Sequence, residues 1–149
     1  MSINHYLLIK RESYTPAGET LSAYDSALTL LKAGLWPLWK HTRNRRAIRT
    51  GDKVAIYLSG QDNKTVIGTA QIDKVEDWNR ATAKAYPLIL DGEPASALFL
   101  KNHTLFSEPK PIQPRLNRLS FYKGGSKWGA AFMGGTRSLT PEDFLVLTQ

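Results

Sequence analysis

The sequence contains no cysteine and only three histidines among its 149 residues. Without cysteine there is no disulfide, no thiolate zinc site and no cysteine nucleophile, and this composition fits a reducing compartment. The three histidines lie far apart along the chain, which argues against a histidine-based metal site. We therefore expect a protein that uses no metal and no other cofactor.

Long apolar runs are missing as well. The apolar residues 6–9 near the N-terminus are followed at once by the charged residues 10–12. That run is too short for the core of a signal peptide, and no small-residue cleavage pattern follows it. Nowhere does the chain approach the roughly 20 consecutive apolar residues that cross a bilayer. These absences predict a cytoplasmic protein with no membrane partner.

What is present is ordinary for a globular protein. Hydrophobic residues make up 42% of the chain and charged residues 22%, values that indicate neither disorder nor a fibrous class. A chain of this length buries most of its apolar surface around one core. We expect a single domain over residues 1–149.

Apolar periodicity predicts strands and helices in the first half of the chain. Residues 5–10 are apolar on both faces, which is typical of a central strand. A helix is expected from about Ser22, a candidate N-cap, to Gly34, a typical helix stop. Residues 54–59 predict a half-buried strand, and a polar turn joins it to a second strand at 65–72. They form the clearest predicted hairpin.

The second half of the chain is read in the same way. Further strands are expected at 83–90, 97–100 and 128–133, and a helix begins at Thr140. The prolines at 109, 111 and 114 predict an extended loop without helix. The sequence thus predicts about six strands and two or three helices, and these elements do not alternate as in βαβ units. This count predicts the α+β class, with a mixed, largely antiparallel sheet that curls toward a barrel and has helices against it.

Two tryptophans flank a proline just after the predicted first helix. Pro37 interrupts the helical pattern, so we expect Trp36 and Trp39 on a turn, followed by a short helix at about 40–46. Exposed rings beside cations suit stacking on a nucleic-acid base. For Trp36, which closely follows an amphipathic helix, a buried packing role is an equal alternative.

Positive charge is concentrated in residues 40–53. The window holds six Lys or Arg and a single acid, Asp52, and so carries +5 of the chain's net charge of +7. Such concentration is typical of a patch that steers a polyanion, although a solvated helix face with incidental basic residues is an even alternative. The candidate phosphate-binding residues are Lys40, Arg43, Arg45, Arg46, Arg49 and, in a second, glycine-rich basic loop, Lys127.

The sequence gives little support to two catalytic interpretations, a nucleotide hydrolase and a ribonuclease. Residues 124–127 include two glycines and a lysine, but they lack the spacing of a phosphate-binding loop and no long helix follows them. A nucleotide hydrolase is therefore not expected. His41 beside Arg43 suits the base of a ribonuclease, yet a histidine in a basic run is more often a phosphate contact or a solvated side chain.

Several of these segments together resemble the EVE domain of the PUA-like superfamily, which is related to YTH domains. The resemblance covers nearly the whole chain, and its most specific part is a Gly-Asp strand followed by an Ile-Gly strand. The matching segments are residues 6–12, 35–36 with the basic segment, 51–57, 66–70, 119–122, 127–128 and 142–144.

The resemblance implies a PUA-like pseudobarrel with a pocket for a modified base, and methylated cytosine in DNA is the base proposed for EVE-type readers. It makes Trp36 one wall of the pocket and puts Asn44 at a base edge. The chain departs from the usual EVE pattern after Trp36, where Asp-Gly-Val-Arg-Asn is common, and at Tyr6, where Trp is frequent. The base-pocket candidates are Trp36, Trp39, Asn44, Tyr57 and Trp128.

The sequence thus predicts a module that binds DNA or RNA carrying a modified base, and favours a reader over an enzyme. It would capture the base in an aromatic cleft and hold the flanking phosphates with the basic segment. Two alternatives stay open. One is a ribonuclease like those among ASCH domains, with His41 or a lysine as the base. The other is a PUA-like domain that binds a small ligand or a protein.

Overall fold

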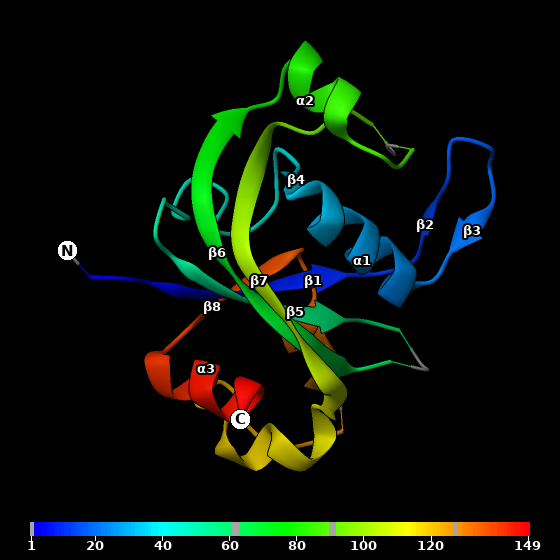
Figure 1. Cartoon of the computed structure of the whole chain (residues 1–149). Coiled ribbons are helices and arrows are strands. Elements are labelled where there is room, and N and C mark those ends of the chain that lie inside the picture. Colours follow the sequence, from blue (N-terminus) through cyan, green and yellow to red (C-terminus); the bar gives the residue numbers. More distant parts are fainter. Residues whose placement is uncertain (1, 61–62, 90–91, 127) are drawn as a thin grey trace.

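A curled six-stranded sheet forms the centre of the molecule (Figure 1), and its strand order is β4-β7-β6-β5-β1-β8. The computed structural model describes residues 2–60, 63–89, 92–126 and 128–149. The sheet strands are β1 (His5–Lys10), β4 (Leu35–Leu38), β5 (Lys53–Leu58), β6 (Thr65–Asp77), β7 (Ser96–Pro111) and β8 (Thr136–Leu139). A separate small hairpin consists of β2 (Ser13–Tyr14) and β3 (Thr20–Leu21).

Three α-helices and two 3₁₀ helices complete the described part of the chain. They are α1 (Ala23–Ala33), α2 (Arg80–Ala85), α3 (Pro141–Thr148), η1 (Gln113–Arg118) and η2 (Trp128–Phe132). None of the helices in the described ranges has the length and apolar character needed to cross a membrane.

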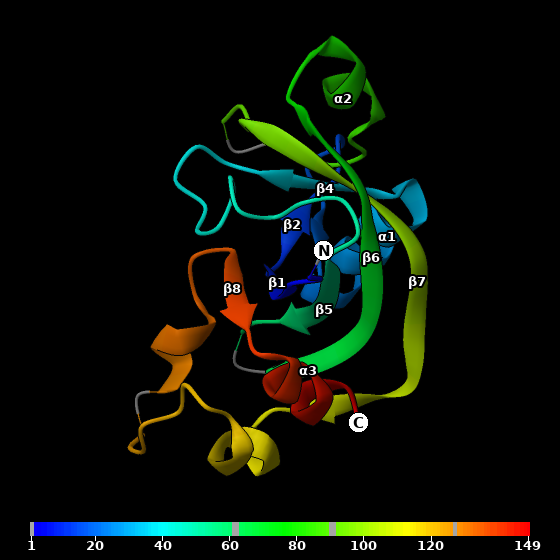
Figure 2. The same cartoon turned by 90° about the vertical axis from the view of Figure 1, so that its left-hand side faces the viewer.

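The sheet is mixed and largely antiparallel, as predicted. Strand β1 runs parallel to β5, and the other neighbouring pairs are antiparallel. The two long strands β6 and β7 bend together around one side of the molecule (Figure 2), with register shifts along their ladder. At Gly68 a Cβ atom would lie 2.2 Å from the Thr104 carbonyl oxygen. Only glycine permits this close approach of β7, which helps the sheet to curl.

The predicted first helix is confirmed together with its ends. The Ser22 side chain accepts a hydrogen bond from the Asp25 backbone N–H, which satisfies one of the free donors of the first turn. Gly34 ends the helix in the left-handed conformation, at φ 68°, which glycine adopts without strain.

The two faces of the sheet carry two separate hydrophobic clusters. On β1, Tyr6 and Leu8 point into the first cluster, while Leu7 between them points into the second. Strand β5 alternates in the same way, with Ile56 in the first cluster and Tyr57 in the second. The prediction that residues 5–10 form a strand buried on both faces is therefore confirmed, because β1 lies between β5 and β8.

Some predicted elements are wrong. Trp36 does not lie on a turn but in β4, which pairs with β7 at the edge of the sheet; an edge strand tolerates Pro37 because one side of its backbone needs no partner. The short helix expected at 40–46 is absent from that described stretch, which forms successive turns.

The C-terminal half contains the other errors. The strand expected at 83–90 gives way to helix α2, which a capping box between Asn79 and Thr82 starts; residue 90 lies outside the described residues. The proline-rich loop is instead the end of β7 followed by η1. The strand expected at 128–133 is the 3₁₀ helix η2, and the last strand is β8. Local apolar content cannot distinguish a short strand from a short buried helix.

Candidate nucleic-acid interface

The basic loop, defined here as residues 39–52 between β4 and β5, is held in shape by its own hydrogen bonds. The Thr42 hydroxyl oxygen accepts from the Trp39 backbone N–H at 2.9 Å. The Asp52 carboxylate accepts from the backbone N–H groups of Arg49 at 2.8 Å and Asn4 at 3.0 Å. Ile48 is buried in the first cluster. The acid of the loop therefore faces inward, and its cations remain on the outside.

The cations of the basic loop are open to solvent. Lys40, Arg43, Arg46 and Arg49 are exposed, and Arg45 is half-buried. The ion pairs found among the described residues join Lys74 to Glu76 and Lys101 to Asp73, so none involves this loop. Five cations without a carboxylate partner create the positive potential that attracts a polyanion.

A hollow of about 340 Å³ opens between the basic loop and β8, and we call it the arginine hollow. It is lined by Arg43, Asn44, Arg137 and Ser138. Asn44 adopts a positive φ of 61°, a conformation that asparagine tolerates better than most residues. Its Nδ2 donates to the Thr136 hydroxyl oxygen at 3.3 Å. The hollow is therefore lined by cationic and neutral polar groups, with no carboxylate.

The hydroxyl group of Thr136 fixes which way the Asn44 amide points. Thr136 is fully buried, and its single hydroxyl proton is donated to the Arg43 carbonyl oxygen. The hydroxyl oxygen can then only accept from Asn44, so the amide nitrogen must face Thr136. This leaves the Asn44 Oδ1 atom as a hydrogen-bond acceptor without a partner among the described residues.

Arg137 is the site residue that the sequence reasoning missed. Its Nη1 donates to the Ala131 carbonyl oxygen at 3.3 Å, and its guanidinium lies 3.9 Å from the centroid of the Phe121 ring. Its Nε is buried without a partner in the described structure. Burial, and next the nearby charge of Arg43, lower the pKa of Arg137, although Asp143 acts in the opposite direction. Two neighbouring guanidinium groups disfavour each other's charge, and a bound anion would relieve this repulsion.

Arg137 could have been found only from the correct position of the last strand. With that strand expected at 128–133, nothing marked Arg137 as a residue facing the basic loop.

The predicted aromatic residues do not meet in one pocket. Trp36 is only 3% exposed and belongs to the first cluster, so the structure supports its packing alternative. Tyr57 is 2% exposed and stacks on Phe132 with centroids 4.8 Å apart. Burial raises the pKa of Tyr57 to about 12. Trp128 packs against the second cluster.

Trp39 and Asn44 are the base-pocket candidates that lie with the predicted cations. The Trp39 ring is half-buried, and it follows β4 directly at the start of the basic loop. His41 is exposed and makes no hydrogen bond within the described ranges, so it has no acid partner there. Lys127, the remaining phosphate candidate, lies outside the described residues.

No protein-family model matches the sequence, and a search of curated proteins finds no significant match. Solved structures, however, match along nearly the whole chain. An ASCH protein from Zymomonas mobilis superposes with a TM-score of 0.63 at 13% identity, over 96% of this chain and 92% of that one. Human THYN1, in complex with DNA containing 5-methylcytosine, gives a TM-score of 0.61 at 16% identity, over 97% and 95% of the two chains.

The N-terminal domain of McrB from Staphylothermus marinus is also similar, with a TM-score of 0.57 at 14% identity over 96% of this chain and 92% of that one. At such low identities the likeness concerns the fold. Together with the curled six-stranded sheet, it confirms the predicted fold class: the chain has the PUA-like pseudobarrel fold of ASCH and EVE domains.

Proposed function

We propose that the protein is a nucleic-acid-binding module that captures a single base at the arginine hollow and holds the flanking phosphates with the basic loop. The observation that carries the proposal is the position of the hollow. It opens beside five cations that form no ion pair within the described ranges; one of them, Arg43, lines the hollow, and Arg137 of β8 lines it as well.

The phosphate contacts follow from the chemistry of arginine. A guanidinium group presents a planar fork of donors that matches two phosphate oxygens. Arg43 and Arg137 line the same hollow, and Arg45, Arg46 and Arg49 extend the positive surface along the loop. Each neutralised phosphate releases counterions, so binding should weaken steeply as salt is added.

The base contact would use Asn44 and Trp39. The Oδ1 atom of Asn44, which has no partner among the described residues, can accept a hydrogen bond from the exocyclic amino group of cytosine. The half-buried Trp39 ring, at the start of the same loop, would offer a stacking surface. A methyl group on the base would add apolar contact, at roughly 0.8 kcal/mol for each buried carbon. These features support 5-methylcytosine as the first ligand to test.

The structural comparison points to the same class of ligand. Human THYN1, which shares the fold over 97% of this chain, was solved with DNA that contains 5-methylcytosine. The chain departs from that relative at most positions, so the preferred base rests on Asn44 and Trp39 themselves.

Titration of fluorescently labelled oligonucleotides tests this function. Single-stranded and double-stranded DNA and RNA, each with cytosine or 5-methylcytosine, would be titrated at increasing salt. We expect binding that falls steeply with salt and is tighter for the methylated base. Arg45→Ala should weaken both forms alike, because a phosphate contact carries no base information. Trp39→Ala should weaken the methylated form more.

A matched control and a nuclease assay complete this test. Lys84→Ala removes an exposed cation from α2, outside the basic loop, and should leave affinity unchanged. The proposal would be refuted if no binding occurred at low salt, or if the affinity did not change with salt concentration. RNA incubated with the protein should stay intact, whereas cleavage that disappears in His41→Ala would support a nuclease.

A further inference from the structure

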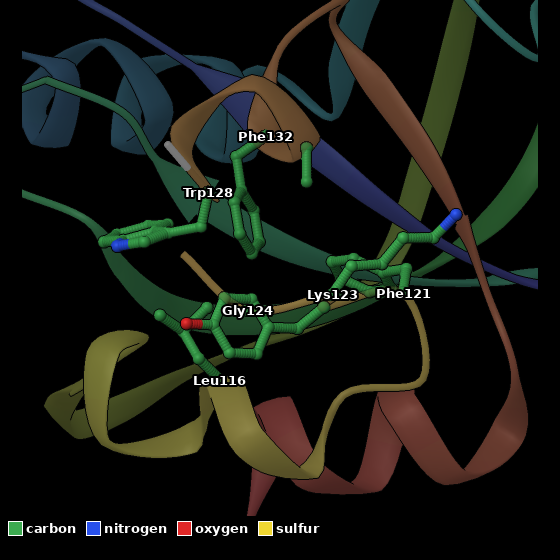
Figure 3. A pocket seen from close by; sticks show the side chains of 8 residues that line it. Leu116, Phe121, Lys123, Gly124, Trp128 and Phe132 are labelled. Atoms are coloured by element: carbon green, nitrogen blue, oxygen red, sulfur yellow. The ribbon is translucent and has the colours of Figure 1, made fainter. Parts of the chain in front are cut away.

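A second hollow lies between η1 and η2, and we call it the aromatic slot (Figure 3). Its volume is about 180 Å³. Trp128 and Phe132 lie on one side of the opening and Leu116 on the other (Figure 3). Pockets for drug-sized ligands are larger, about 300–1,000 Å³, so this slot suits a single planar ring system. Its main lining residues are Leu116, Phe121, Tyr122, Lys123, Trp128 and Phe132.

The walls of the slot are fixed before any ligand arrives. Phe132 is buried, and its ring meets Trp128 edge to face, with centroids 5.8 Å apart and the ring planes at 89°. The Tyr122 hydroxyl donates to the Gly125 carbonyl oxygen at 3.1 Å. The residue before Phe121 is anchored too, because the Asp143 carboxylate accepts from Ser120 N at 2.8 Å and Ser120 Oγ at 2.5 Å. A preformed slot spares a ligand the entropic cost of ordering it.

The charges around the slot select what can enter it. Lys64 Nζ lies 5.2 Å from the centroid of the Trp128 ring, and Lys123 lines the opening. The Arg137 guanidinium stacks on Phe121, another lining ring. No carboxylate is among the lining residues. Aromatic rings with cations held over them favour a planar group that carries negative charge nearby, and a nucleotide has this combination.

The slot is joined to the arginine hollow through Arg137. This side chain lines the hollow, and it also contacts Phe121 and Ala131 of the slot. The Arg43 backbone N–H donates to the Gly134 carbonyl oxygen at 3.4 Å, so the basic loop touches the segment that follows η2. Figure 2 shows the basic loop and η2 on the same side of the molecule, with β8 between them.

We propose that the aromatic slot is a second nucleic-acid subsite, which stacks an unpaired base of the same strand whose nucleotide occupies the arginine hollow. This inference rests on the proposed function and deepens it, because a base inside the slot cannot be paired at the same time. The ligand is therefore single-stranded nucleic acid, or a strand end, and Arg137 supports both subsites.

Two oligonucleotides of equal length separate stacking from phosphate binding. One is oligothymidylate, and the other has the same backbone but only abasic sites. Trp128→Leu should lower the affinity for oligothymidylate by roughly 5- to 150-fold, which corresponds to about 1–3 kcal/mol of stacking. It should leave the affinity for the abasic strand unchanged. Trp128→Phe keeps a ring in place and should retain most of the affinity.

A second pair of variants keeps the test decisive. Ala131→Leu places extra side-chain volume in the slot without changing its charge, and should cause the same selective loss if Trp128→Leu fails to fold. Arg45→Ala should weaken both strands alike. If folded Trp128→Leu or Ala131→Leu binds oligothymidylate as the natural protein does, the slot is not a subsite, although salt-dependent binding would still support the proposed function. If neither strand binds the natural protein, both proposals fail.

Discussion

The two faces of the sheet are closed in different ways, and two tryptophans show the difference. The first cluster is covered by the 11-residue helix α1 and by strand β4, and Trp36 is buried inside it. The second cluster is covered by α3 and by the short helices η1 and η2. There Trp128 stays partly exposed at the edge of the aromatic slot.

A long regular element packs a continuous apolar stripe and leaves little surface open. Short 3₁₀ helices joined by glycine-rich loops cannot do so, because each offers no more than about two turns of side chains. The second face therefore keeps aromatic rings at the surface, where a ligand can reach them. Single substitutions on each face test this difference, and the two tryptophans should show the largest effect.

Replacing the two tryptophans should have very different costs. Trp36→Ala removes a fully packed ring and should lower the free energy of unfolding by about 3–5 kcal/mol. Trp128→Ala removes a half-exposed ring and should cost clearly less. Urea denaturation followed by circular dichroism measures both values. Equal losses would mean that the two faces are equally closed.

Removing the Asp143 carboxylate should loosen the second face. Asp143→Ala leaves the Ser120 donors without their acceptor, and we expect a loss of about 3 kcal/mol in the free energy of unfolding. Burial alone would raise the pKa of Asp143, but hydrogen bonds from Ser120 and Thr140 outweigh it and lower the pKa. The stability that this carboxylate contributes is therefore present above its unfolded pKa, near 4, and is lost as the pH falls below it.

The free energy of unfolding at acidic pH tests the expected direction of this pH dependence. Urea titrations of the natural protein between about pH 6 and pH 3 should show a loss of stability that is shallower in Asp143→Ala. Glu142→Ala, at the exposed neighbouring position, is the matched control and should follow the natural protein.

The buried Thr136 hydroxyl group beside the arginine hollow should contribute less to the free energy of unfolding than the Asp143 carboxylate. Thr136→Val keeps the shape of the side chain but removes the acceptor for Asn44 and the donor to the Arg43 carbonyl oxygen. We expect about 1–2 kcal/mol of lost stability, together with weaker nucleic-acid binding because the Asn44 amide is no longer held. Ser138→Ala, at an exposed position of the same strand, should change stability by less than about 0.5 kcal/mol. An unchanged affinity in Thr136→Val would show that Asn44 needs no such support.

A dependence of stability on pH is expected at Lys10, the last residue of β1. Burial, and next the charge of Arg11, lower its pKa to about 8. The unfolded chain then holds the proton more tightly than the folded one, so stability should rise as the pH increases from about 8 toward 10. Above that range the trend reverses, because burial holds the pKa values of Tyr57 and Tyr86 at about 12. Lys10→Met should lack the rise in urea titrations at pH 7, 8 and 9.

Much of the fold could be predicted because its signals are local. The burial of β1 on both faces, the caps of α1 and the start of α3 at Thr140 each depend on a few adjacent residues. The elements that were predicted wrongly are short. Strand β4 and helix η2 each contain a tryptophan and small or apolar neighbours, and only their partners in space decide their conformation.

One part of the candidate site could be predicted from the sequence, and the other part could not. The cations of the basic loop could be predicted, since charge at the surface needs no partner to be recognised. The base pocket could not be predicted, because the aromatic rings expected to line it lie on opposite faces of the sheet. Trp36 and Tyr57 belong to different clusters, and Arg137 reaches the hollow from the last strand, 93 residues after Asn44 along the chain.

The sequence alone predicts the class of the fold, the ends of its main helices and the place where positive charge gathers, because periodicity, capping and charge are properties of neighbouring residues. The three-dimensional packing shows which aromatic rings lie in the core and which lie at the surface. The packing also brings Arg43, Asn44 and Arg137 into one hollow. Burial and proximity depend on how the sheet curls and on which segments cover each face, and these are set by contacts between residues far apart in the chain.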